Sequence, residues 1–329
     1  QLQTTNPSVM ASLAKENYLP EIALCLDDAG QVFEVQAQVS QAEKSYRDAI
    51  RIRELSRNLA RENRRVDQFL ARSQTNLGKL LLATDRFSEA RASLHAADQI
   101  YSQLVSDFPD RADCRTEWSH CLMSLSRCHS SQQDWGPAAT NAGQAVDQLQ
   151  YVFRQANSLA VRDGLANYMM TYSRLLRRTG EEDLAEQQFQ QAKELAKDRF
   201  GPCNSHAWHL ALEDSLTESD QAIALELSET SSRLAPHLGY IWNTRALVLA
   251  RAKRWDESLS AIEQAIQLGQ GGVPSDWYIK SMALAGKGDL EGARKWYAMA
   301  ESARISRSPN HVELRQQARL AGSLLFAQP

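Results

Sequence analysis

The sequence predicts an all-α fold, an α-α superhelix built from antiparallel helical hairpins. Residues that favour helices, such as Ala, Leu, Gln, Glu and Arg, are frequent, while the 329 residues include only 15 Gly and 9 Pro. A pattern of small and large residues also recurs along most of the chain. The chain is longer than one compact core usually becomes, and a repeat array avoids that limit.

Each expected hairpin is marked by a small residue on its first helix, because two antiparallel helices approach closely only where side chains are small. These markers are 48, 48 and 47 residues apart at Gly30, Gly78, Ser126 and Ser173. The period then shortens to 34 and 35 residues at Leu212, Ala246 and Ser281. Fourteen extra residues make about four helical turns, so two turns added to each helix would keep the same face inward.

These periods divide the chain into four expected regions. Residues 1–17 form a connector or partial repeat, 18–200 about four long hairpins, 201–302 about three short hairpins, and 303–329 a C-terminal capping helix. The unit around Leu212 is the least regular, because it lacks the aromatic residue and paired alanines of the others. The capping helix would cover the last hairpin with an apolar stripe: Val312, Leu314, Leu320, Leu324 and Leu325.

The last two hairpins show the repeat most clearly. They contain Trp242, Ala246, Leu249, Trp255, Ser258, Ile262 and Ala265, and then Trp277, Ser281, Leu284, Leu290, Ala293, Tyr297 and Ala300. This motif resembles the tetratricopeptide repeat (TPR), and the resemblance extends over nearly the whole chain. It implies a non-catalytic solenoid that holds segments of other proteins in a groove lined by the first helix of each hairpin.

Four short segments carry a narrower resemblance. Residues 46–50, 104–109, 240–244 and 292–297 look like parts of the C-terminal TPR regions of bacterial serine/threonine protein kinases of the planctomycete type. The chain contains no Gly-rich phosphate loop, His-Arg-Asp loop or Asp-Phe-Gly. Because the chain begins at Gln1 and not at Met, we expect it to be a processed product or a part of a longer protein. A kinase domain, if there is one, would lie outside this chain.

Charge and composition narrow the classes of partner. With 37 basic and 40 acidic residues, the net charge is −3, so the basic surplus typical of nucleic-acid binding is missing. No apolar run approaches the ~18 residues of a membrane-spanning helix. Five Cys in so long a chain fit a reducing compartment. We expect a cytoplasmic location, either free or within a larger membrane-attached protein.

The first helices of the hairpins concentrate cations and Asn residues on the predicted inner face. Arg can hold carboxylates or phosphates through paired N–H donors, and Asn can bind an extended backbone. We therefore predict a protein or peptide partner with an acidic or phosphorylated extended segment; a solvated face without a ligand is the alternative. The predicted groove residues are Arg72, Asn76, Lys79, Met123, Arg127, Asn167, Met170, Arg174, Arg177, Arg178, Asn243 and Arg251.

Catalytic and metal chemistry find little support in the residue pattern. Cys203, His206 and His209 have spacings that could bind Zn, but no fourth ligand is apparent, and Pro202 indicates the start of a repeat helix. No paired carboxylates or Ser-His-Asp order is brought together by the periodicity. We predict no catalytic residue, no metal and no cofactor. The function that we predict first is an interaction scaffold. The alternative is a regulatory or substrate-recruiting region of a kinase, and a metal-dependent enzyme is a remote third possibility.

Overall fold

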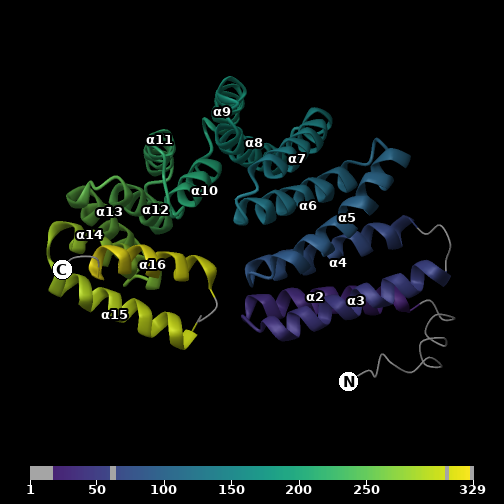
Figure 1. The fold of residues 1–329 in the computed structure, drawn as a ribbon, viewed down its shortest axis with the longest axis horizontal. Helices are drawn as coiled ribbons and strands as arrows, with labels where there is room; N and C mark the ends of the chain where they lie inside the picture. Colours follow the sequence, from purple (N-terminus) through teal and green to yellow (C-terminus); the bar gives the residue numbers. More distant parts are fainter. Residues whose placement is uncertain (1–17, 60–63, 308–310, 327–329) are drawn as a thin grey trace. The chain divides into compact units, whose positions relative to one another are not determined.

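The computed structural model describes residues 18–59, 64–307 and 311–326. Within these ranges the chain forms fifteen α-helices and no strand (Figure 1). The helices follow one another as antiparallel hairpins, so the predicted all-α class is confirmed. The expected connector at 1–17 lies outside the described residues.

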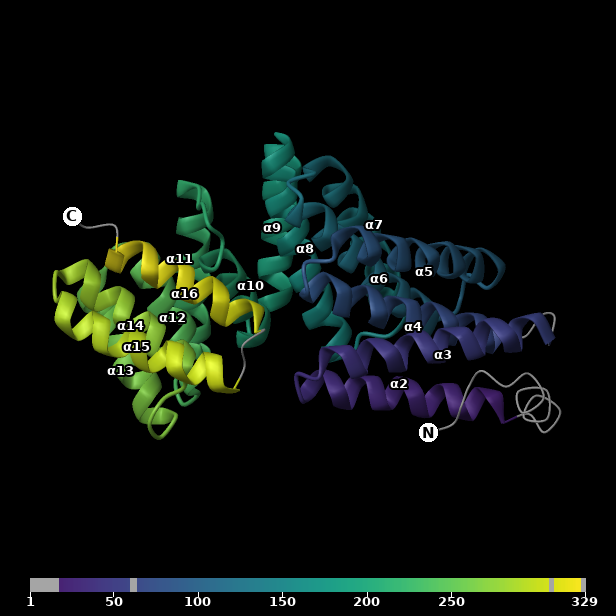
Figure 2. The same cartoon turned by 60° about the horizontal axis from the view of Figure 1, so that its bottom comes forward.

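The helices divide into two compact units, described here one at a time. The first unit comprises residues 1–157 and 175–181, and the second comprises 158–174 and 182–329, so α8 (Leu159–Thr179) contributes to both. The first unit contains α2 (Leu19–Val35), α3 (Val39–Leu59), α4 (Arg64–Ala83), α5 (Phe87–Asp107), α6 (Ala112–Ser131) and α7 (Trp135–Gln155). They pair as α2 with α3, α4 with α5 and α6 with α7, and Figure 2 shows α2 and α3 side by side.

The second unit continues the same arrangement. It contains α9 (Glu182–Ala196), α10 (Phe200–Ala211), α11 (Glu218–Leu234), α12 (Gly239–Arg251), α13 (Trp255–Leu268), α14 (Pro274–Lys287), α15 (Leu290–Arg307) and α16 (Val312–Phe326). Hairpins form between α10 and α11, α12 and α13, and α14 and α15. None of the described helices combines the length and the apolar character that crossing a membrane requires.

Six hairpins share one turn geometry. Seven residues after the small marker of the first helix, the backbone has a positive φ between 57° and 89°. Five residues later, a fully buried small residue begins the packed part of the second helix. The left-handed residues are Ala37, Asp85, Gln133, Gly180, Lys253 and Gly288, and the buried ones are Ala42, Ala90, Ala138, Ala185, Ser258 and Ala293. Long and short hairpins are thus built on the same turn.

The small residues are the points of closest approach within the hairpins. Ser126 Oγ donates a 2.8 Å hydrogen bond to the carbonyl oxygen of Ala138. Ser281 and Ala293 repeat this bond at the same spacing and distance. At Gly78 a Cβ atom would lie 2.6 Å from the buried Leu94 side chain, so the position requires glycine. These contacts confirm the predicted role of the small markers.

Helix lengths follow the two repeat periods in the middle of each half, although α9 has 15 residues and α15 has 18. The helices α4 to α7 have 20 or 21 residues, whereas α12 to α14 have 13 or 14. The difference of about seven residues is about two turns per helix, which preserves the buried face. Assigning residues 18–200 to four long hairpins and 201–302 to three short ones stays an interpretation of this pattern.

The unit around Leu212 departs from the common turn. The helix α10 ends at Ala211, and α11 begins after Thr217, whose Oγ1 accepts a 3.0 Å bond from the Asp220 backbone N–H. The Asp220 carboxylate accepts in return from the Thr217 N–H at 3.4 Å, which completes a capping box. A helix cap therefore replaces the left-handed turn of the other hairpins here.

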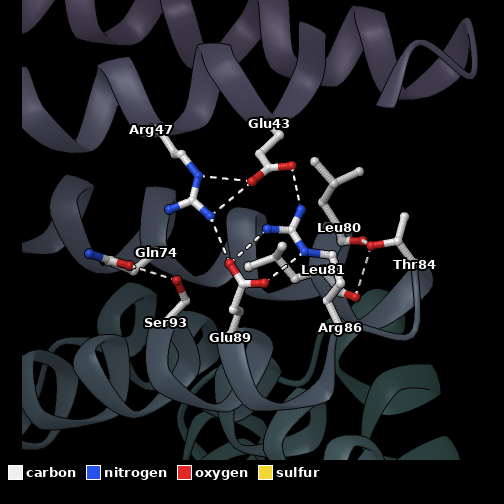
Figure 3. Close-up of polar contacts among 9 residues, drawn as sticks. All are labelled: Glu43, Arg47, Gln74, Leu80, Leu81, Thr84, Arg86, Glu89 and Ser93. Atoms are coloured by element: carbon white, nitrogen blue, oxygen red, sulfur yellow. Dashed lines mark hydrogen bonds and ion pairs between the residues drawn. The ribbon is translucent and has the colours of Figure 1, made fainter. Parts of the chain in front are cut away.

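A ring of four charges joins α3 to α5 (Figure 3). Arg47 and Arg86 each contact both Glu43 of α3 and Glu89 of α5, with N–O distances of 2.6 to 3.2 Å. Arg86 directly follows Asp85, which has a left-handed backbone conformation in the α4–α5 turn. One of the two cations therefore belongs to the turn. The hydrogen bond from Arg86 lowers the pKa of Glu43, against the opposing effect of burial. This charge ring links one hairpin to the next.

The C-terminal helix α16 packs on α14 and α15, as the predicted cap requires. Leu325 is buried with Ala285 and Ala293, and the Phe326 ring meets Tyr297 edge-on at 5.6 Å between centroids. In the first half of α16, Gln317 Nε2 donates to Ser275 Oγ at 2.8 Å. The helix is thereby fixed along its length to the last hairpin.

Candidate protein-interaction surface

Two predicted groove cations lie near each other on successive hairpins. Lys79 on α4 and Arg127 on α6 are exposed, and both act electrostatically on His120. His120 is itself exposed at the surface, but desolvation by neighbouring groups lowers its pKa, Lys79 and Arg127 lower it further, and Glu117 opposes them. We call Lys79, His120 and Arg127 the cationic face. Asn76, one turn before Lys79 on the same helix, is half-buried.

A hollow of about 700 Å³ lies at the beginning of α4 and α6. We call it the arginine hollow; it is lined by Arg64, Arg65, Gln68, Phe69, Arg72, Arg111 and Asp113. The Phe69 ring is contacted by the guanidinium groups of Arg65 and Arg72, at 5.7 and 5.0 Å from its centroid. Arg64 lies 4.0 Å from the centroid of Phe108. Such cation–π contacts hold planar guanidinium groups in defined orientations.

Hydrogen bonds fix the polar side of the arginine hollow. Arg111 Nη2 donates to Gln68 Oε1 at 2.7 Å, and Gln68 Nε2 donates to Asp113 Oδ2 at 3.0 Å. Arg72 forms an ion pair with Glu117 of α6. Arg111 also lowers the pKa of Asp113 by hydrogen bonding, so this carboxylate stays ionised. The side chains of α4 and α6 are thus connected across the hollow.

A buried ion pair lies next to the Phe69 ring. Asp27 of α2 and Arg53 of α3 are 2% and 3% exposed, and Arg53 Nη1 lies 2.5 Å from Asp27 Oδ2. Ser73 Oγ of α4 donates to the same carboxylate at 2.9 Å. The Arg53 guanidinium lies 5.6 Å from the centroid of Phe69. The pair connects three helices, and removal of one partner would leave an uncompensated buried charge.

The sequence prediction included Arg72 but missed the other six residues of the arginine hollow, among them three arginines and Phe69. Arg64, Arg65, Phe69 and Arg111 were not among the predicted groove residues. The signal was present in part, since Arg65, Phe69 and Arg72 have the four- and three-residue spacings of one helix face. Arg111 lies just before α6, where helix periodicity gives no orientation.

Three predicted groove residues do not line an open face, which corrects the expectation of exposed side chains. Met123 and Met170 are buried in the apolar interior. Asn243 is also buried, and its Nδ2 donates to Asp276 Oδ1 at 2.5 Å. Helix periodicity alone placed them on the surface, whereas helices packed on neighbouring hairpins cover a wider part of each first helix. Asn167 is half-buried.

Two predicted groove arginines bind other parts of the chain within the second unit. Arg174 of α8 forms an ion pair with Glu213, in the segment between α10 and α11. Arg251 Nη2 of α12 donates to the carbonyl oxygens of Glu213 and Asp214 at 2.6 and 3.3 Å. Both arginines therefore hold the irregular segment after α10.

The last two predicted cations are half-buried at the end of α8. The Arg178 guanidinium lies 5.7 Å from the centroid of Trp135, within the first unit. Arg177 is its half-buried neighbour and also has an interaction partner. Of the twelve predicted groove residues, Lys79 and Arg127 combine exposure with a shared electrostatic effect on one side chain.

Four of the five cysteines are buried, and Cys25 is exposed. Burial raises the pKa of Cys114 to about 11, of Cys121 to about 12 and of Cys203 to about 11, so these thiols are protonated at neutral pH. His206 is buried near Cys203, while His209 is exposed with Nδ1 2.6 Å from the Ser205 carbonyl oxygen. In the part of the chain that the structure describes, no group of three His, Cys, Asp or Glu residues is placed to hold a metal.

Comparisons with known proteins return solved structures at low sequence identity. No family model matches the chain, and no curated protein matches its sequence. Among solved structures, a TPR protein from Parabacteroides merdae is 13% identical and covers 92% of this chain and 99% of its own, with a TM-score of 0.49. Yeast Tom70 is 11% identical and covers 94% and 77%, with a TM-score of 0.41.

A third solved structure is the C-terminal part of a TPR repeat-containing protein from Cytophaga hutchinsonii. It is 12% identical and covers 76% of this chain and 93% of its own, with a TM-score of 0.40. At these identities and scores, the class of the protein rests on the turn and contact geometry that its own hairpins repeat. The protein is an all-α array of antiparallel helical hairpins with a C-terminal capping helix.

Proposed function

We propose that this chain is a protein-interaction scaffold that holds an extended acidic segment of another protein against α4 and α6. The cationic face carries this proposal, because Lys79 and Arg127 both lower the pKa of His120. Both cations are exposed on the first helices of successive hairpins, and the carboxylate of Glu117 acts in the opposite direction. A positive local potential on a chain of net charge −3 favours a negatively charged ligand.

The residues beside the cationic face suit an extended peptide. Asn76 lies one turn before Lys79 and has an amide that can both donate to and accept from a peptide backbone. Exposed charges contribute only about 0.2–1 kcal/mol each, so several contacts along the segment must add up. Because these charges face solvent, affinity should fall as salt is added.

Fluorescence titration with two peptides tests this function. A labelled Glu-rich peptide should bind, and its affinity should fall about tenfold or more when Lys79→Glu and Arg127→Glu are combined, because two attractions become repulsions. A peptide with Gln in place of Glu should bind weakly to both proteins.

A second double variant controls for the overall change in charge. Arg154→Glu combined with Lys197→Glu changes two other exposed cations by the same amount and should leave the affinity unchanged. Equal affinity of the wild type and the Lys79 and Arg127 variant would show that the cationic face does not bind the segment. Arg174 is unsuitable for such a test because it holds Glu213.

A further inference from the structure

We propose that the arginine hollow binds the phosphate group of a phosphorylated residue within the bound segment. This proposal rests on the proposed function and adds to it a ligand class and a second contact point. Four guanidinium groups and one carboxylate line the hollow, so its lining is strongly cationic. A phosphate carries a charge of about −1.5 to −2 at pH 7 and suits such a site better than one carboxylate does.

The orientation of the arginines favours phosphate over a diffuse anion. Arg72 and Arg111 are fixed by Glu117, Gln68 and Asp113. Arg64 stacks on Phe108 and forms no ion pair with any residue of 18–59, 64–307 or 311–326. Planar guanidinium groups from α4 and from Arg111, which precedes α6, can thus share the oxygens of one phosphate, each through a pair of N–H donors.

The base of the arginine hollow is rigid. Phe69 lies over the Arg53 guanidinium, which is held by Asp27 and Ser73 in the buried network. A site held in place before binding loses less conformational entropy when a ligand enters. Its volume of about 700 Å³ accommodates a phosphorylated side chain together with adjacent backbone.

The arginine hollow and the cationic face lie along the same side of α4. Residues 65, 69, 72, 76 and 79 follow spacings of four and three, which place them in one row. Seven residues separate Arg72 from Lys79, about 10.5 Å along the helix axis. An extended peptide covers that distance in about three residues. The phosphorylated residue should therefore be about three residues from the acidic run.

Three peptides distinguish this proposal from the proposed function alone. They are a Glu-rich peptide with an added Ser, the same peptide with phosphoserine three residues before the Glu run, and one with phosphoserine three residues after it. One of the phosphopeptides should bind about tenfold more tightly than the unphosphorylated peptide. The gain should shrink as salt is raised from low to physiological concentration.

The hollow variant combines Arg64→Gln and Arg65→Gln, which remove two cations without introducing repulsion. It should bind the unphosphorylated peptide within a few-fold of the wild type while losing most of the gain from phosphorylation. The control combines Arg51→Gln and Arg154→Gln, at exposed positions outside the hollow, and should keep the gain. Matching thermal unfolding of the three proteins would establish that the folds are equivalent.

The possible outcomes separate the two proposals. If phosphorylation brings no gain, or brings the same gain in the hollow variant, the arginine hollow does not bind the phosphate although the scaffold function stands. If no peptide binds, both proposals are wrong. If inorganic phosphate competes at the concentration of the phosphopeptide itself, the hollow binds a free anion and not a protein segment, which also overturns the proposal.

Discussion

At the scale of single residues, the hairpin turns use a backbone conformation that most side chains avoid. Ala37, Asp85, Gln133 and Lys253 adopt positive φ although each carries a Cβ atom. This conformation costs roughly 1–2 kcal/mol for a residue with a side chain. Its recurrence shows that the packing of the two helices on each turn more than offsets the cost.

Glycine at the same turn position should be sensitive to substitution. Gly288 has φ of 89°, and nothing lies within 4 Å of an added Cβ, so Gly288→Ala should cost about 1 kcal/mol through the backbone alone. Gly136 on α7 has equal space without a left-handed backbone, so Gly136→Ala should be neutral or stabilising by up to about 1 kcal/mol. Urea denaturation measures both free energies. Equal effects of the two substitutions would contradict a backbone cause.

At the scale of helices, the charge ring predicts a pH-dependent link between α3 and α5. The pKa of Glu43 is lowered, first by the hydrogen bond from Arg86, and that of Glu89 is lowered by the same arginine. A carboxylate with a lowered folded-state pKa stabilises the fold above its unfolded value, and this contribution is lost as pH falls through the folded value. The charge ring should thus act at neutral pH and disappear in acid.

Arg86→Gln tests that link. At pH 7 the variant should be slightly less stable than the wild type, because solvent screens these largely exposed charges. Guanidinium chloride is unsuitable because it screens charge, so urea denaturation from pH 7 to pH 3 is the measurement. The difference should vanish on the acid side. The control is Lys295→Gln, which removes an exposed i,i+4 ion pair with Glu291. If the stability difference between Arg86→Gln and the wild type persists at pH 3, the ionic explanation is excluded.

The cap α16 should contribute to stability mainly through its buried side chain. Leu325 is 2% exposed against Ala285 and Ala293, whereas the adjacent Phe326 is 64% exposed. Leu325→Ala should cost about 2–3 kcal/mol, near the low end for buried leucine because the end of an array can relax. Phe326→Ala should cost clearly less despite removing a larger side chain. Thermal unfolding measures the loss of stability in both variants. If Phe326→Ala costs more than Leu325→Ala, the main contact of the cap is not the buried Leu325 side chain.

At the scale of the whole molecule, the repeat made most of the fold predictable. The positions of Gly78, Ser126 and Ser281 predicted the close contacts that the structure shows, because helix packing permits few residue types there. The cap was predictable because a repeat array must cover its last apolar surface. The capping box at Thr217 was not predicted, since the sequence comparison sought the regular turn and the unit lacks it.

The candidate site was predictable only in part. Lys79 and Arg127 follow from helix periodicity, because their exposure depends on position within one hairpin. The burial of Met123 and Asn243 depends on neighbouring hairpins, and the arginine hollow depends on where the start of α6 meets α4. The net charge of −3 gave no sign of a local cationic face, because a total is insensitive to how charges are distributed.

The cationic face gives the scaffold a pH dependence that follows from linkage. Desolvation and the charges of Lys79 and Arg127 lower the pKa of the surface residue His120, against Glu117, so the neutral imidazole is favoured at pH 7.5. An anionic segment bound to the two cations would raise that pKa. Because linkage is reciprocal, protonation of His120 must then strengthen binding, and affinity for the Glu-rich peptide should rise as pH falls from 7.5 to about 6.

Peptide carboxylates stay ionised over that interval, since their pKa values are near 4.3. His120→Gln should therefore abolish the rise in affinity while retaining binding at pH 7.5. NMR titration of His120 with and without the peptide measures the same coupling from the other side, and the two values must agree. Two results together would contradict this placement: a wild-type affinity that does not change from pH 7.5 to 6, and a His120 pKa that saturating peptide does not change. The acidic segment would then not lie beside Lys79 and Arg127.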